Sequence, residues 1–337
     1  MTGDSTTKVL VPTSGHTMYN NNHNISCEAD TESDDDINQR QQGRRSTQTH
    51  VTFSRPCLIF VAHENCEIRE RGYYFDSNGE KVDIKDALQN SMTKSTAYHY
   101  QDSLPLLPSF DLYFKTKFHI YKGSSIDALQ LLISNGGHVG VLNSASGKTP
   151  GGKWLKGTLS QEDVICRASL LYPCLEQFLP DARAMYHVNN NNDEFLYSSS
   201  GCCIYSPNVP VIRQDDNVQP QLLDTFFTAD ILSMPAPNAF VLGRKQNGKS
   251  ALKDEMFFRL RRALTLFANH GCTDLVLCAF GCGIHGNNPQ MVASSWKRLF
   301  SSPEFEGRFQ TVVFAINPLR PGNYTAFQEE LENAECS

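Results

Sequence analysis

Two glycine-rich segments hold the residues whose types and spacing could do chemistry. The first combines Thr149-Pro150-Gly151-Gly152 with the start of a helix at Gln161. Glycines let the backbone approach a ligand and adopt positive φ, and a helix start offers unpaired amides to a phosphate. The segment therefore predicts a phosphate-binding loop, with a mobile surface loop as the alternative interpretation.

The triplet Gln161-Glu162-Asp163 places three polar side chains at the start of an otherwise apolar helix. Ser160 and Asp163 have the spacing of a capping box, in which each side chain bonds the backbone N–H of the other residue. A carboxylate there also interacts favourably with the positive end of the helix dipole. From the spacing alone, helix capping is the favoured interpretation and chemistry is the alternative.

The second segment runs from Phe280 to Pro289 and contains Gly281, Gly283 and Gly286 within six residues. Successive glycines can form a nest of backbone amides that holds a diphosphate. One such turn is weak support for a site. Two of them, one joined to a carboxylate pair, indicate a nucleotide-like ligand.

The eleven cysteines lie mostly inside apolar runs, as small buried hydrophobic side chains do, and no disulfide framework is visible. Cys278 and Cys282 are four residues apart and His285 follows, which is a conceivable zinc pattern. Structural zinc sites ordinarily add a second pair of ligands nearby, and none appears. We therefore expect no metal site.

Secondary structure must bring these segments together. Short apolar runs predict strands, and apolar residues spaced three and four apart predict helices. Strands are expected at residues 118–121, 138–145, 202–212, 225–234, 274–280 and 311–316, and helices at 126–133, 161–175, 253–270 and from 289 onward. Buried strands that alternate with helices form a mostly parallel sheet covered on both faces. Ligands of such sheets bind at the carboxyl ends of the strands, where both glycine segments fall.

The composition limits the remaining possibilities. The 337 residues carry a formal charge of −6, which disfavours a protein that coats nucleic acid but allows one anionic ligand bound by backbone amides. Residues 1–50 are rich in Ser, Thr, Asn, Asp and Gln and predict a disordered polar tail. No apolar run reaches the roughly 20 residues of a membrane span, and no signal-peptide core is visible. We therefore expect a soluble cytoplasmic or nuclear protein with no membrane partner.

The run VLNSASGKTPGGKWLKGTLSQEDVICRASLLYPCL (residues 141–175) resembles the signature of microbial-type poly(ADP-ribose) glycohydrolases. That signature reads as an apolar strand, an Asn, small residues, a Pro-Gly-Gly-Gly loop and Gln-Glu-Glu at a helix start. The resemblance continues in YSPNVPVIR, MPAPNAF, LVLCAFGCGIHGNNP and VVFAI, in the same order. It implies a macrodomain-like three-layer α/β/α fold with a central mixed, mostly parallel sheet. The expected catalytic domain spans 51–337, with an N-terminal layer at 51–117 and a macrodomain core at 118–337.

The resemblance also implies roles for residues by their position. Gly151 and Gly152 would shape the first loop around a diphosphate and the distal ribose, and Asn143 would position that ribose or the loop. Gln161-Glu162-Asp163 would form the acidic motif, whose last residue transfers the proton in the family.

The second loop receives its roles in the same way. Gly281, Cys282 and Gly283 would cradle the diphosphate, and His285 would lie over the distal ribose.

Three positions depart from the family pattern. Lys153 stands where the family has the third loop glycine, Asp163 where it has the second glutamate, and His285 where it usually has Phe. Lys153 could pair with the diphosphate or crowd the ribose. Asp163 has a side chain one methylene shorter, and a reach deficit of about 1 Å can cost on the order of 10²-fold in rate.

The implied activity is removal of ADP-ribose from poly(ADP-ribose) or from an ADP-ribosylated protein or nucleic acid. We expect Asp163 to donate the proton and then activate water, with Glu162 as the competing candidate. The alternative is an ADP-ribose reader or degenerate pseudoenzyme with little turnover, which the three departures favour. No cofactor is expected, and the chain is expected to be a monomer.

Overall fold

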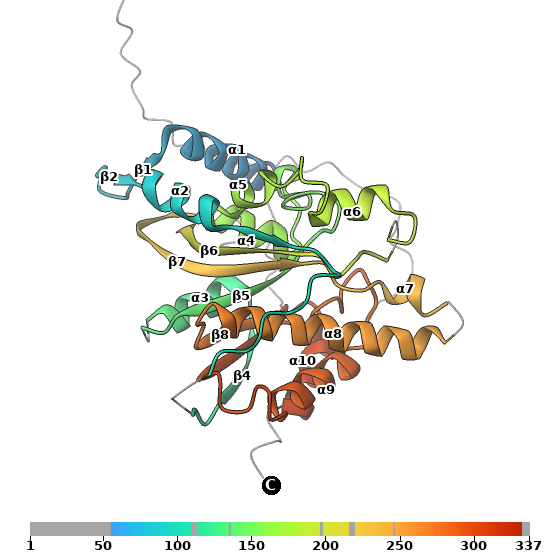
Figure 1. Cartoon of the computed structure of the whole chain (residues 1–337). Helices are drawn as coiled ribbons and strands as arrows, with labels where there is room; N and C mark the ends of the chain where they lie inside the picture. Colours follow the sequence, from blue (N-terminus) through green and yellow to red (C-terminus); the bar gives the residue numbers. More distant parts are fainter. Residues whose placement is uncertain are drawn as a thin grey trace, which may run out of the picture. The chain divides into compact units, whose positions relative to one another are not determined.

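A seven-stranded sheet organises the protein (Figure 1). The computed structural model describes residues 55–331 except 110–112, 135, 196–197, 216–219 and 245–246. The strands of the sheet are β3 (Thr96–Tyr98), β4 (Lys117–Lys122), β5 (Val139–Ser144), β6 (Cys203–Arg213), β7 (Leu222–Met234), β8 (Asp274–Cys278) and β9 (Thr311–Ile316). A separate hairpin consists of β1 (Tyr73–Phe75) and β2 (Lys81–Asp83). The polar tail predicted for residues 1–50 lies outside the described residues.

The strand order of the sheet is β3-β6-β7-β5-β8-β9-β4. The pairs β7·β5, β5·β8, β8·β9 and β9·β4 are parallel, whereas β3·β6 and β6·β7 are antiparallel. The mostly parallel sheet predicted from the sequence is therefore confirmed, and the antiparallel strands at one edge make it mixed.

Alternate side chains of each strand pack into two hydrophobic clusters, one on each face of the sheet. Val141 of β5 and Val276 of β8 belong to the first cluster, while Leu142 and Leu277 belong to the second. The first face is covered by α1 (Arg55–Arg71), α2 (Lys85–Lys94), α3 (Ser125–Ile133), α4 (Gln161–Ala168), α5 (Leu171–Glu176) and α6 (Met185–Asn191), and the second by α8 (Gly248–Asn269), α9 (Pro289–Phe300) and α10 (Pro321–Leu331). This is the expected three-layer α/β/α arrangement (Figure 1).

The single helix predicted for residues 161–175 is wrong, because the chain forms α4 and α5 with a break between them. Ser169 has extended backbone angles, φ −135° and ψ 174°, and forms an antiparallel bridge with Val211. The N–H of Leu170 donates to the carbonyl of Pro210 at 2.9 Å. Pairing with β6 thus interrupts a stretch whose apolar residues have the spacing of one continuous helix.

The N-terminal layer predicted at 51–117 contains α1, α2 and β3 in its described part. A buried arginine of β6, Arg213, holds α1 in place. Its Nε donates to Asn65 Oδ1 at 2.8 Å and its Nη2 to Glu64 Oε2 at 2.5 Å, both on α1. Its Nη1 donates to the carbonyl of Pro220 at 2.9 Å. The buried guanidinium of Arg213, each of whose three nitrogens donates a hydrogen bond, therefore attaches this layer to the sheet.

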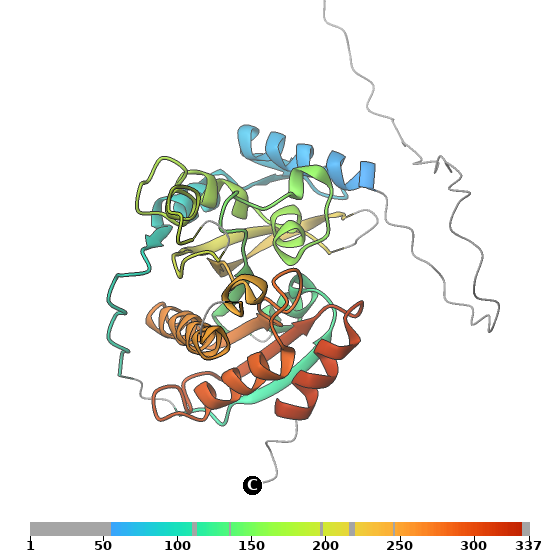
Figure 2. The same cartoon turned by 90° about the vertical axis from the view of Figure 1, so that its right-hand side faces the viewer.

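An extended strap, residues 99–109, leaves β3 and runs down one side of the molecule toward β4 (Figure 2). Arg262 of α8 is buried beneath it and donates to the carbonyls of His99 at 2.7 Å and Asp102 at 3.4 Å. Backbone carbonyls of the strap are therefore bonded to α8, which keeps the strap on the surface of that helix.

Two further properties concern the described residues as a set. None of their helices is both long and apolar enough to cross a membrane. The nine cysteines among them all have free thiols, and eight of these residues are buried.

Candidate active site

The two glycine-rich loops follow neighbouring strands that run in the same direction. The first loop, residues 145–153, follows β5, and the second loop, residues 279–288, follows β8. β5 and β8 pair directly and in parallel. Both loops therefore leave the same edge of the sheet, as the sequence predicted.

Gln161 is the first residue of α4 and joins this helix to the end of β5 and the start of α3. Its Oε1 accepts from the N–H of Ser144 at 2.9 Å. Its Nε2 donates to the carbonyl of Leu142 at 2.9 Å and to Ser125 Oγ at 2.7 Å. The side chain thus fixes where α4 starts relative to the end of β5 and the start of α3.

Glu162, the second residue of α4, is only 2% exposed. Its Oε2 accepts from the N–H of Ser146 in the first loop at 2.7 Å. Burial raises the pKa of Glu162 to about 8; the charge of Asp163 adds to the rise, while the Ser146 N–H and the Asn143 amide oppose it. At neutral pH this carboxyl therefore holds a proton that it can donate.

Asn143, near the end of β5, is buried beside the same carboxyl. Its Nδ2 donates to Ser233 Oγ of β7 at 3.0 Å. Among the described residues, neither Asn143 Oδ1 nor Glu162 Oε1 has a hydrogen-bond partner. Buried oxygens without a donor cost free energy. This corner of the site therefore leaves the proton of Glu162 free to pass to an oxygen of a ligand, and leaves Asn143 Oδ1 free to accept a hydrogen bond from one.

Asp163, the third residue of α4, uses both of its oxygens on backbone amides. Its Oδ2 accepts from the N–H of Ser160 at 2.8 Å, and Ser160 Oγ accepts from the N–H of Asp163 at 3.3 Å. This confirms the predicted capping box. Its Oδ1 accepts from the N–H of Lys153 at 3.0 Å. Asp163 therefore ties the first loop to the start of α4.

Two adjacent glycines of the first loop allow it to lie directly over the carboxylates. Gly151 and Gly152 have φ of +66° and +62°, a region that side chains with a Cβ rarely adopt. A Cβ on Gly152 would lie 2.9 Å from Glu162 Oε2 and 3.2 Å from Asp163 Oδ1. Lys153 follows with φ −121°, which any residue can adopt, so the loop accepts lysine there.

The second loop is held closed by Asn287. Its Nδ2 donates to the carbonyls of Gly281 at 3.0 Å and Pro237 at 2.8 Å. Gly281 has φ +71°, and a Cβ there would lie 2.5 Å from Asn287 Nδ2 and 2.6 Å from Ala236 Cβ. At Gly283 a Cβ would meet nothing within 4 Å. The loop thus needs glycine at its base and has open space at its tip.

Cys282 and His285 occupy different environments in the second loop. Burial raises the pKa of the Cys282 thiol to about 12. Burial lowers the pKa of His285, and the charge of Arg259 lowers it further, so its ring is neutral. The carbonyl of His285 accepts from the N–H of Ala239 at 2.9 Å, where α7 (Ala239–Leu242) begins. Among the described residues, Cys278, Cys282 and His285 form no group with the spacing of metal ligands.

Comparison with known proteins identifies the family. The model of the microbial-type PARG catalytic domain, where PARG stands for poly(ADP-ribose) glycohydrolase, matches residues 62–214. The crystal structure of PARG from Thermomonospora curvata is 30% identical, with a TM-score of 0.75, over 82% of this chain and 100% of that one. This chain belongs to the microbial-type PARG family.

Ligand-bound PARG structures are similar to this chain as well. T. curvata PARG bound to the inhibitor ADP-HPD is 31% identical, with a TM-score of 0.73, over 82% of this chain and 99% of that one. Deinococcus radiodurans PARG in complex with ADP-ribose is 30% identical, with a TM-score of 0.60, over 73% of this chain and 97% of that one. Among curated proteins, none matches the chain.

Sequence reasoning missed two residues of this candidate site. Ser146 supplies the N–H bonded to Glu162, and Asn287 closes the second loop. Ser146 lies among the small residues after Asn143, and no side-chain chemistry distinguishes it. Asn287 could have been found, because Asn side chains readily bond nearby backbone groups in turns.

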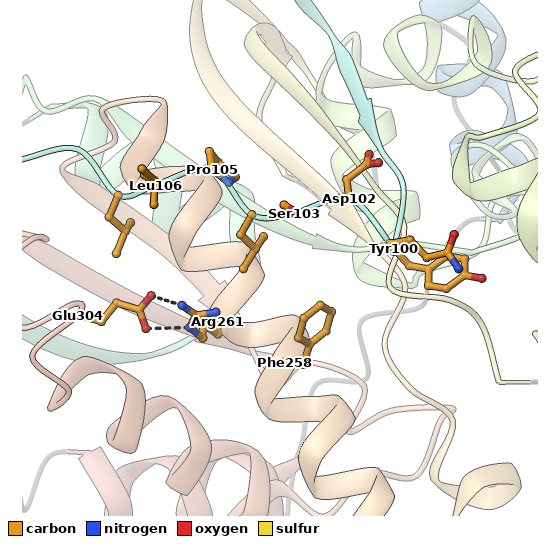
Figure 3. Close-up of a pocket in the computed structure, with 11 residues that line it drawn as sticks. Tyr100, Asp102, Ser103, Pro105, Leu106, Phe258, Arg261 and Glu304 are labelled. Atoms are coloured by element: carbon orange, nitrogen blue, oxygen red, sulfur yellow. Dashed lines mark hydrogen bonds and ion pairs between the residues drawn. The ribbon is translucent and has the colours of Figure 1, made fainter.

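A surface hollow of about 520 Å³ lies beside the strap and is lined by none of the loop residues (Figure 3). Its wall includes Phe258, Arg261 and Glu304 together with residues 100–107. Arg261 and Glu304 are joined there by two hydrogen bonds of 2.8 and 2.5 Å. The candidate site is therefore defined by its loops and carboxyl groups rather than by this hollow.

Proposed function

We propose that this PARG family member removes ADP-ribose from poly(ADP-ribose) or from an ADP-ribosylated target by hydrolysing an O-glycosidic bond. Family membership makes the chain a glycosidase-type hydrolase. The observation that carries the assignment to this site is the buried carboxyl of Glu162, whose pKa is raised to about 8 by burial and which lies directly under a glycine loop at the shared edge of two parallel strands.

ADP-ribose is bound by the D. radiodurans enzyme, and the T. curvata enzyme binds the inhibitor ADP-HPD. In this chain we propose that the diphosphate binds the backbone amides of Gly281, Cys282 and Gly283. The open space at Gly283 supports this placement, because a ligand can approach the backbone closely there. Gly151 and Gly152 would then contact the distal ribose, and the neutral ring of His285 would cover it.

Hydrolysis of a ribose–ribose bond passes through an oxocarbenium-like transition state. A carboxylic acid protonates the leaving oxygen as its bond to the anomeric carbon breaks. The resulting carboxylate then takes a proton from water, whose oxygen forms the new bond to that carbon, and the acid is restored. One carboxyl group can serve both steps.

We assign the proton transfer to Glu162. It holds a proton at neutral pH, and its Oε1 is a buried atom without a partner among the described residues. Asp163, which the family pattern favours, accepts two backbone N–H bonds through its two oxygens. Its role in this proposal is to keep the first loop over Glu162 and to raise the pKa of Glu162 with its charge.

Lys153 has a separate place in the proposal. Its backbone is committed to Asp163, while its side chain is exposed to solvent. An exposed ammonium at the rim of the loop is suited to pair with a phosphate of the substrate.

The reader function is the second candidate. Both oxygens of Asp163 accept backbone N–H bonds, and a carboxylate held in this way is poorly placed to transfer a proton. Because Asp163 stands where the family has its second glutamate, this arrangement favours the reader function. In both cases we propose a monomer in the cytoplasm or nucleus that acts on a modified protein, a modified nucleic acid or the polymer. Free thiols in all nine described cysteines support a reducing compartment.

The deciding experiment follows the release of ADP-ribose from labelled poly(ADP-ribose) by the full chain, with ADP-ribose binding measured by calorimetry. We expect release by the wild type, and loss of release with retained binding in Glu162→Gln. Binding without any release by the wild type would establish the reader. Absence of both would overturn the proposal.

A further inference from the structure

A second group of polar side chains lies at the opposite end of the same strands. His138 directly precedes β5, Asp230 lies within β7, and Cys272 precedes β8. Asp230 pairs in register with Gly140 near the start of β5, whereas Asn143 of the PARG site lies at its end. The group is therefore separate from the glycine loops.

The three side chains converge on one point. His138 Nε2 lies 3.0 Å from Asp230 Oδ2, and Cys272 Sγ lies 3.9 Å from the same oxygen. One potential ligand atom from each residue lies within 4.8 Å of the other two. Ligand atoms around one tetrahedral ion at about 2.0–2.3 Å are about 3.3–3.6 Å apart, and the separations of 3.0 and 3.9 Å lie on either side of that range.

The hydrogen bonding of His138 favours a cation. Its Nδ1 lies 3.2 Å from the carbonyl oxygen of Gly271, which can only accept. That bond places the proton of a neutral ring on Nδ1 and leaves a lone pair on Nε2, directed toward Asp230. When the ring of His138 is neutral, its acceptor atom Nε2 therefore faces a second acceptor atom, Oδ2 of Asp230. Either a second proton or a metal ion must lie between them.

The groups around Asp230 resemble the outer contacts that orient a metal ligand. The O–H of Tyr205 donates to Oδ2 at 2.5 Å, and the N–H of Asn208 donates to Oδ1 at 2.8 Å. Such bonds fix a carboxylate and tune its affinity. Asp230 and Cys272 are buried, and the side chain of His138 is 40% exposed. An ion can therefore enter from the side of His138.

We propose that His138, Asp230 and Cys272 form a binding site for a zinc-type divalent ion. Imidazole, carboxylate and thiolate together suit zinc rather than magnesium or calcium. Binding releases the thiol proton of Cys272 as the sulfur–metal bond forms, and a water from the exposed side completes four ligands. The ion would connect the starts of β5 and β8 to the middle of β7, so its role is structural.

The test uses the full chain, freed of metal and then titrated with Zn²⁺ or Co²⁺. Cobalt bound to a thiolate gives a charge-transfer band in the near ultraviolet, which reports directly on Cys272. We expect one equivalent of metal, the thiolate band, and a higher Tm in the presence of zinc. Tyr205→Phe removes one outer contact and is expected to weaken binding about tenfold.

Matched variants distinguish this site from other ligands in the chain. Cys272→Ser should remove the band and His138→Ala should weaken zinc binding, while Cys66→Ser and His63→Ala should leave both unchanged. His138 is exposed, so its substitution keeps the assay informative even if Cys272→Ser folds poorly. No bound metal would overturn the proposal in favour of a protonated His138–Asp230 ion pair. A band that survives Cys272→Ser would overturn it by placing the metal on another thiolate.

Discussion

The backbone N–H of Lys153 donates a 3.0 Å hydrogen bond to Oδ1 of Asp163. Any residue except proline at position 153 can make this bond, because it comes from the main chain and the local φ of −121° is unstrained. The bond links the variable position of the first loop to the acidic motif. The side chain at 153 can therefore vary without releasing the loop from α4.

The carboxyl pair gives the first prediction. Glu162→Gln cannot transfer a proton and should reduce ADP-ribose release by about 10²–10⁴-fold. Asp163→Asn keeps one acceptor and loses one of its two N–H bonds. It should cost about 1 kcal/mol of stability and retain most of the release. Rates and denaturation midpoints of the two variants test this.

The reverse outcome would reassign the proton donor. If Asp163→Asn abolishes release while Glu162→Gln retains it, Asp163 is the acid. Asp163→Glu, which restores the side-chain length of the family, should then raise the rate. Ser160→Ala is the matched control, because it removes one half of the capping box and leaves both carboxyl groups in place.

The pH dependence of activity and stability gives the second prediction. The folded-state pKa of Glu162, about 8, lies above its ordinary value of 4.5, so the folded state binds this proton more tightly than the unfolded state. Its contribution to stability is complete below about pH 4.5 and is lost as the pH rises toward 8, by at most about 1.4 kcal/mol per pH unit. Urea unfolding at pH 5.5 and 7.5 should show this loss of stability in the wild type and not in Glu162→Gln. Release of ADP-ribose should decline above about pH 8 in the wild type.

Gly281 and Gly283 of the second loop give the third prediction. Gly281→Ala places a Cβ 2.5 Å from Asn287 Nδ2 in a positive-φ conformation, so it should lower Tm and weaken ADP-ribose binding. Gly283→Ala meets nothing within 4 Å and should leave Tm unchanged. If the diphosphate lies on this amide, Gly283→Ala should still weaken binding, which calorimetry with ADP-ribose measures. Unchanged binding in Gly283→Ala would remove Gly283 from the ligand site.

Two arginine–carboxylate pairs of the same 2.5 Å length give the fourth prediction. The side chain of Arg213 is 3% exposed in its pair with Glu64, and that of Arg183 is 69% exposed in its pair with Asp102. Breaking a buried pair costs about 3–5 kcal/mol, and an exposed pair contributes about 0–1 kcal/mol. Arg213→Met should therefore destabilise the protein far more than Arg183→Met in chemical denaturation. Equal losses would show that burial does not set the difference.

Local chemistry explains what could be predicted from the sequence. The capping box of Ser160 and Asp163 spans four consecutive residues, so spacing alone defines it. The glycine loops and the strands before them follow from the same short-range patterns. The break between α4 and α5 does not, because Ser169 leaves the helix to pair with Val211, 42 residues away.

The protonation of Glu162 was likewise outside the reach of the sequence. It depends on complete burial under the first loop and on the position of Ser146. The His138 group has the same origin, because the parallel register of β5 and β7 brings Asp230 beside residues far from it in the chain. Long-range packing, rather than composition, decides which polar residues meet.

The place of β4 at one edge of the sheet has a consequence for synthesis on the ribosome. Its neighbour in the sheet is β9, the last strand among the residues that the structure describes, and β9 also pairs with β8. At the usual rates of translation, β4 emerges about 10–40 s before its partner exists. The unpaired backbone edges of both β4 and β8 must therefore be kept from other chains until residues 311–316 are available, so chaperone demand should be greatest in this late stage.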